Sequence, residues 1–220
     1  MEYHLRSHRY YIGLLIGLLM IFFIGPFFDD FAYGTKIVGA SLIFTLIFAV
    51  LIISHNKKLT ILANLLALPL IIDRISLLIG LDISINYVFS ALCGILFILL
   101  VAVIMFRDII LSKKVDTALL TGSIVLYFML GLMWGFIYLI IAYLYPESFN
   151  YNFLQIMDIK DLTNTLMYYS MVTLTTLGYG DITPLSGPAR AMSIMQTVTG
   201  QMYLSILIAR LVSINLMQKQ

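Results

Sequence analysis

Long apolar runs separated by short polar breaks restrict what this chain can fold into more than any other feature. A helix needs about 20 mostly apolar residues to cross a bilayer. Six runs of roughly that length stand in the sequence, at residues 10–28, 36–54, 59–81, 84–106, 117–145 and 189–216. Only 11% of the 220 residues are charged, whereas a soluble domain carries about 25%. The sequence therefore predicts an all-α membrane protein with six transmembrane helices, and it excludes a soluble enzyme.

Lysine and arginine predict the orientation of these spans, because they gather in the short cytoplasmic loops of membrane proteins. With a cytoplasmic N-terminus, three of them lie outside (Lys36, Lys160 and Arg190) and Arg74 lies within the membrane. Nine then lie on the cytoplasmic side: Arg6, Arg9, Lys57, Lys58, Arg107, Lys113, Lys114, Arg210 and Lys219. No small-residue cleavage site follows the first apolar run, so we interpret it as an uncleaved span. Both termini are expected in the cytoplasm of a multi-pass protein of the cell membrane.

A shorter segment, residues 162–175, lies between the fifth and sixth spans. As a helix its roughly 14 residues measure about 21 Å, too short to cross a bilayer. We therefore expect a re-entrant helix that enters and leaves by the same face, buried in protein or beside water. Gly178 and Gly180 follow, and glycine readily adopts positive φ angles. Such a loop turns successive carbonyls toward one axis, where they replace the hydration shell of a cation, and one loop supplies a quarter of the ring.

The loop resembles the selectivity filter of potassium channels. Thr176-Leu177-Gly178-Tyr179-Gly180 is similar to the signature of that family, and Asp181 extends it. The wider similarity covers about residues 117–212 and implies a pore domain over residues 117–220. Within that domain it implies an outer helix at 117–145, a pore helix at 162–175, a filter at 176–180 and an inner helix at 189–216. Residues 1–106 then form a four-helix transmembrane domain, and residues 107–116 a cytoplasmic connector.

The resemblance also implies roles for the loop residues. The carbonyls of Thr176, Leu177, Gly178 and Tyr179, with the Thr176 hydroxyl, are expected to coordinate dehydrated K⁺ ions in a column of sites. The residues expected to support the filter are Thr175, Tyr168, Tyr169, Tyr179 and Asp181, the last through a hydrogen bond. Leu177 replaces the valine that is commoner in the family, which leaves the carbonyl unchanged but alters the packing behind it.

Gating is expected to differ from that of voltage sensors, which carry several basic residues on one membrane helix. The fourth run, residues 84–106, holds no charged residue. The architecture is thus that of a voltage-gated-like channel without sensor charges, and no steep voltage dependence is expected. Gly200 falls where the family often has a hinge glycine. A bending point and close helix packing are both open interpretations of it.

Three further features concern charge and the membrane interface. Asp73 and Arg74 stand inside the third run, after Pro69, and project about 100° apart on a helix, so partners on other helices are expected. A buried pairing that fixes helix packing and a gating or ligand role both remain open. Arg107, Lys113 and Lys114 suit anionic lipid headgroups, although ordinary topogenic charge explains them equally well. Separately, Tyr138, Tyr143 and Tyr145, like Tyr10 and Tyr11, fit an interfacial aromatic belt.

These observations together predict a homotetrameric, potassium-selective channel, of prokaryotic origin by its family resemblance. K⁺ is the permeant ion, and neither an organic cofactor nor nucleic acid is expected. A weakly selective cation channel, a subunit of a potassium uptake transporter and a non-conducting or regulatory membrane subunit are the alternatives. The transporter family places four degenerate loops in one long chain, whereas a single intact loop stands here.

Overall fold

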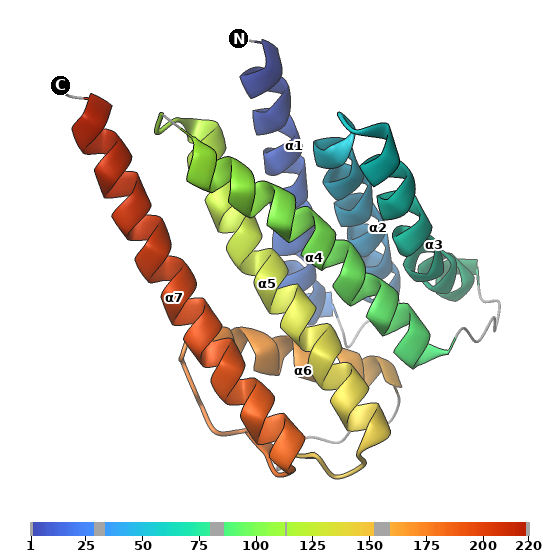
Figure 1. The fold of residues 1–220 in the computed structure, drawn as a ribbon. Coiled ribbons are helices and arrows are strands. Elements are labelled where there is room, and N and C mark those ends of the chain that lie inside the picture. Colours follow the sequence, from blue (N-terminus) through green and yellow to red (C-terminus); the bar gives the residue numbers. More distant parts are fainter. Residues whose placement is uncertain (1, 29–33, 80–85, 113, 152–158, 219–220) are drawn as a thin grey trace.

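The structure is a computed structural model that describes residues 2–28, 34–79, 86–112, 114–151 and 159–218. Lys113 and Lys219 lie outside the described residues. The helices are α1 (Glu2–Leu19), α2 (Gly34–Ile53), α3 (Lys57–Ile79), α4 (Tyr87–Leu111), α5 (Thr117–Leu144), α6 (Ile159–Leu174) and α7 (Gly187–Gln218). All but α6 run along a common direction. The described chain ends lie at one end of the bundle, and α6 lies across the opposite end (Figure 1).

Five helices are long and apolar enough to cross a membrane: α2, α3, α4, α5 and α7. The first predicted span is less regular. After Leu19 the chain continues as a π-helical turn, η1 (Met20–Ile24), and a 3₁₀ turn, η2 (Gly25–Phe28). Its apolar helical part, His8–Ile24, is shorter than the other five. These five helices indicate a multi-pass membrane protein, and the sixth span stays a prediction.

Polar side chains mark the beginnings of α4 and α5. The Asn86 side chain accepts hydrogen bonds from the backbone N–H groups of Val88 and Phe89, and the Asp116 carboxylate accepts one from Leu119 N–H at 2.8 Å. These three bonds satisfy N–H groups that have no partner within their helix. Where the sequence predicts a connector from residue 107, α4 continues to Leu111, so Arg107 lies on this helix.

The central element is α5, which packs against α1, α4, α6 and α7. The other helices of the first part pack in chain order, α1 on α2, α2 on α3 and α3 on α4. By contrast α7 is largely exposed along its length, with only 17% of its span buried. A short antiparallel pair joins β1 (Phe149–Asn150) to β2 (Thr183–Pro184). It holds the segment after the loop against the segment that precedes α6.

Candidate functional site: the loop after helix α6

The loop begins with a strained turn at the end of α6. Thr176 has φ +60°, a left-handed conformation that is unusual for a β-branched residue. Its N–H donates to the Thr173 carbonyl at 3.1 Å, and Leu177 N–H donates to the Val172 carbonyl at 3.0 Å. This pair of bonds is the Schellman motif that ends many helices, with threonine where glycine is usual.

Left-handed residues alternate along the loop. Thr176, Gly178 and Gly180 have φ angles of +60°, +59° and +81°, so the positive φ angles expected at the two glycines are confirmed. Among the described residues, no hydrogen bond ends on the backbone carbonyls of Thr176, Leu177, Gly178 or Tyr179. These four oxygens are thus available as ligands. No cluster of three or more His, Cys, Asp or Glu side chains is found in the described part of the chain.

Two glycines of α5 set the position of α6. A Cβ atom on Gly131 or Gly135 would collide with the sulfur of Met171 or Met167, respectively. The glycines are four residues apart, as are the methionines, so each methionine fills the notch opposite it. This small-residue spacing lets helices approach closely in membranes. The Ser170 hydroxyl donates to the Gly131 carbonyl at 2.6 Å and adds a polar contact.

A buried polar network joins α5, α6 and α7. The Gln196 amide nitrogen donates to the carbonyl and the hydroxyl oxygen of Ser170, at 2.9 and 2.8 Å. Its amide oxygen accepts from the Tyr138 hydroxyl at 2.5 Å. All three side chains are almost wholly inaccessible to solvent. The interfacial position predicted for Tyr138 is therefore wrong: its hydroxyl finds its partner inside the protein.

The two tyrosines of α6 face different surroundings. Tyr168 donates to the Asp181 carboxylate at 2.6 Å, and this bond ties α6 to the residue that follows the loop. Burial, followed by the hydrogen bond and the charge of Asp181, raises the pKa of Tyr168 to about 12. Tyr169 is buried, bonds the Ser193 hydroxyl at 2.6 Å and packs edge-to-face on Tyr138, with ring centroids 5.0 Å apart.

Side chains of the loop itself point outward. Leu177 and Tyr179 are 54% and 68% exposed, and both line a cavity of about 310 Å³ between α6 and the first helices. Thr175 also lines it, with its hydroxyl donating to the Met171 carbonyl at 2.8 Å. Arg74 contributes to the wall on the side of α3. The cavity is otherwise mostly apolar.

Residues 94–216, more than half of the 220, match the profile of a protein family described as Ion channel. The chain belongs to this ion channel family. No curated protein and no solved structure matches it. The matched range runs from within α4 to near the end of α7 and includes the whole loop, so family membership points to a channel rather than an enzyme.

Gly200 of the channel lies where α7 crosses the end of α6. A Cβ atom there would stand 2.6 Å from the Leu174 carbonyl oxygen and 3.0 Å from Leu174 Cδ1. The same carbonyl accepts a hydrogen bond from the Tyr127 hydroxyl at 3.2 Å. The helix is continuous through Gly200. This geometry gives the close-packing interpretation a physical cause, because only glycine fits without a shift of the end of α6.

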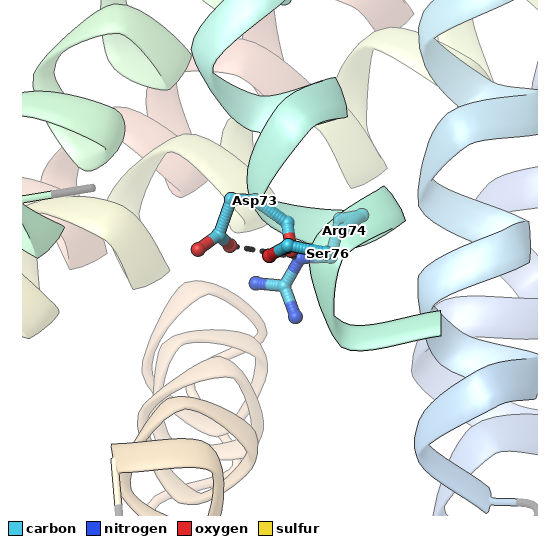
Figure 2. Close-up of polar contacts among 3 residues, drawn as sticks. All are labelled: Asp73, Arg74 and Ser76. Atoms are coloured by element: carbon cyan, nitrogen blue, oxygen red, sulfur yellow. Dashed lines mark hydrogen bonds and ion pairs between the residues drawn. The ribbon is translucent and has the colours of Figure 1, made fainter. Parts of the chain in front are cut away.

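The charged pair in α3 is shown in Figure 2. Arg74 Nε lies 3.6 Å from the Asp73 carboxylate, so the two neighbours pair with each other, contrary to the expected partners on other helices. The flexible arginine side chain spans the angle between the two positions. Ser76 donates to the Asp73 carbonyl at 2.8 Å. Arg74 Nε is inaccessible to solvent and forms no hydrogen bond among the described residues.

The sequence analysis did not predict two features: the polar network of Tyr138, Ser170 and Gln196, and the close contact of Gly131 and Gly135 with the methionines of α6. Ser170 and Gln196 stand among other polar residues, such as Thr173, Ser193 and Thr197, so nothing in the sequence singled them out as network members. The spacing Gly131-x-x-x-Gly135 is a known mark of close helix contact and was visible in the sequence.

Proposed function

We propose that this ion channel conducts K⁺ selectively, as a homotetramer whose four loops surround one axis. The observation that carries the proposal is the backbone of the loop, where left-handed residues at Thr176, Gly178 and Gly180 alternate with Leu177 and Tyr179. Four carbonyls in this stretch have no donor among the described residues. Rings of such carbonyls replace the hydration shell of K⁺ in channel filters. Permeation is then passive, with ions displacing one another from site to site.

Four copies are required because one loop supplies one quarter of each ring. Exposed apolar side chains of α7 are compatible with this assembly, because neighbouring subunits would cover them; they include Ile194, Met195, Val198 and Ile208. Leu177 and Tyr179 are likewise exposed in the single chain. Neighbouring subunits would cover both surfaces.

The carboxyl end of α6 favours cations beneath the filter, because a helix carries partial negative charge at that end. The fourth helix gives no sign of a voltage sensor: between Tyr87 and Phe106 it holds no charged residue, and Arg107 and Asp108 stand in its last two turns. Since gating by voltage requires several charges to move through the field, the proposed channel opens without steep voltage dependence. We place it in the cell membrane of a prokaryote with both termini in the cytoplasm.

Reconstitution into liposomes loaded with K⁺ tests the proposal. We expect barium-sensitive K⁺ flux that exceeds Na⁺ flux, and a tetramer by mass measurement in detergent. Equal fluxes of both ions would refute selectivity, while a folded protein without flux would favour a non-conducting or regulatory subunit. A matched pair of variants sharpens the test. Gly178→Ala strains a left-handed position and should abolish selectivity, whereas Gly187→Ala, on α7 with open space around it, should not.

A further inference from the structure

An open groove lies between α4, α5 and α7, on the half of the bundle that holds the chain termini. Its volume is about 500 Å³. The residues that line it are Ala102, Val103, Phe106, Arg107, Leu126, Leu130, Thr199, Met202, Tyr203 and Ile206. Arg107, Thr199 and Tyr203 carry polar groups, and the other lining side chains are apolar. The Tyr203 hydroxyl is already engaged, since it donates to the Ser123 carbonyl at 2.7 Å.

Arg107 gives the groove a cationic end. It follows Val103 by one helical turn, and Val103 and Phe106 are exposed apolar side chains on the same helix. Among the described residues, the Arg107 guanidinium forms no hydrogen bond and no ion pair within 4.0 Å. The next residue, Asp108, is not part of the groove lining. An exposed cation therefore stands beside an exposed apolar trough near the end of a membrane-crossing helix.

We propose that this groove binds one anionic phospholipid of the leaflet nearest the chain termini. The lipid phosphate would pair with Arg107, and one acyl chain would lie along Val103, Leu126 and Met202. A guanidinium matches phosphate oxygens with two parallel hydrogen bonds, and basic residues at the cytoplasmic membrane surface attract anionic lipid. Charge complementarity thus selects a lipid over an apolar helix, which would leave Arg107 without a partner.

The groove also reaches the inner helix of the proposed pore. Thr199, Met202 and Ile206 lie on α7 on both sides of Gly200, where α7 contacts the pore-helix end. A bound acyl chain would brace α7 against α4 and α5 at this level. This regulatory consequence rests on the proposed function, but lipid binding itself does not.

Lipid retention tests the site directly. The full-length protein would be purified from membranes containing phosphatidylglycerol and phosphatidylcholine, and bound lipid counted by native mass spectrometry. We expect Arg107→Gln to lower phosphatidylglycerol binding about fivefold, the equivalent of the roughly 1 kcal/mol that one basic residue contributes near an anionic surface. Lys114→Gln is the matched control: it removes the same charge from the nearby connector, outside the groove, and should leave binding close to wild type.

A second variant tests the acyl-chain part of the site. Val103→Trp fills the groove but keeps Arg107, and should also reduce phosphatidylglycerol binding. Equal loss in the Arg107 and Lys114 variants would overturn the site in favour of diffuse surface charge. If Val103→Trp leaves the amount of bound phosphatidylglycerol unchanged, the acyl chain does not lie in the groove. A disulfide between subunits through Val103→Cys would show instead that a second copy of the chain covers the groove. Because the readout is bound lipid, failure here is distinguishable from absence of K⁺ flux.

Discussion

Replacing Gly200 with alanine tests how tightly α7 packs against the end of α6. The new Cβ would lie 2.6 Å from the Leu174 carbonyl oxygen, although ordinary van der Waals contact begins near 3.4 Å. That oxygen is backbone, so relief requires α6 or α7 to move. Overpacking of this kind costs about 1–3 kcal/mol, whereas Gly→Ala within a helix gains about 0.5–1 kcal/mol by intrinsic propensity. The midpoints of the two ranges give a net expected loss of about 1 kcal/mol.

Two assays measure the consequence. Thermal unfolding in detergent should show lower stability for Gly200→Ala, and liposome flux should show altered open probability with K⁺ selectivity retained. Gly187→Ala is the control on the same helix, because nothing lies within 4 Å of its added Cβ; it should be neutral or stabilising. Wild-type stability and flux in the Gly200 variant would refute the reasoning from the contact with Leu174.

A double variant separates packing from bending. Gly200→Ala combined with Gln201→Gly restores a flexible position at the exposed neighbouring residue without removing the clash. If α7 bends at Gly200 during opening, the second change should restore the open probability while stability stays low. If close packing alone matters, it should restore neither.

Three other predictions each concern a side chain that forms a hydrogen bond. Tyr168→Phe removes the donor to Asp181 and should lower K⁺-over-Na⁺ selectivity in liposomes without loss of assembly. The pKa of Tyr168 is raised to about 12. The stabilisation from this hydrogen bond is therefore complete below about pH 10, the pKa of free tyrosine, and is lost as the pH rises through 12. A wild-type K⁺-over-Na⁺ selectivity that falls between pH 7 and 9 would contradict this assignment. Gln196→Leu removes the hydrogen bonds that Gln196 forms with the buried Tyr138 and Ser170. It should lower the free energy of unfolding by about 1–3 kcal/mol, measured by thermal unfolding, and unchanged stability would refute this expectation. Arg210→Gln removes the hydrogen bond to the Ser112 carbonyl at 2.9 Å, which ties α7 to the end of α4, and should shift open probability in single-channel recordings while Arg210→Lys shifts it less.

The sequence predicts the helical architecture well because hydrophobic run length decides it. The predicted outer helix, 117–145, and the observed α5, Thr117–Leu144, differ by one residue. Glycine likewise signals positive φ, as at Gly178. Thr176 could not be foreseen in this way, since β-branched residues normally avoid that region. Its conformation follows from the helix-ending hydrogen bonds to Thr173 and Val172, which depend on where α6 stops.

Tertiary partners were the least predictable features. The position of Tyr138 near other tyrosines suggested a membrane interface, but its aromatic neighbours and its bond to Gln196 place it in the core. Arg74 shows the same limit. Helical geometry fixes where its Cα points, yet the length of the side chain let it return to Asp73. Arg107 was assigned to a connector because a polar stretch begins there, whereas Ile109, buried on the inner face, keeps α4 helical beyond it.

These contacts converge on the last turn of α6. A left-handed threonine costs about 1–3 kcal/mol and persists only where its surroundings enforce it. Here α5 provides the Tyr127 bond to the Leu174 carbonyl, and α7 provides the close approach of Gly200 to the same oxygen. One backbone carbonyl thus touches both helices that frame the loop, two residues before Thr176. A movement of α7 at this level must either break its contact with the carbonyl or carry the loop with it, so the end of α6 is where the position of α7 would reach the proposed filter.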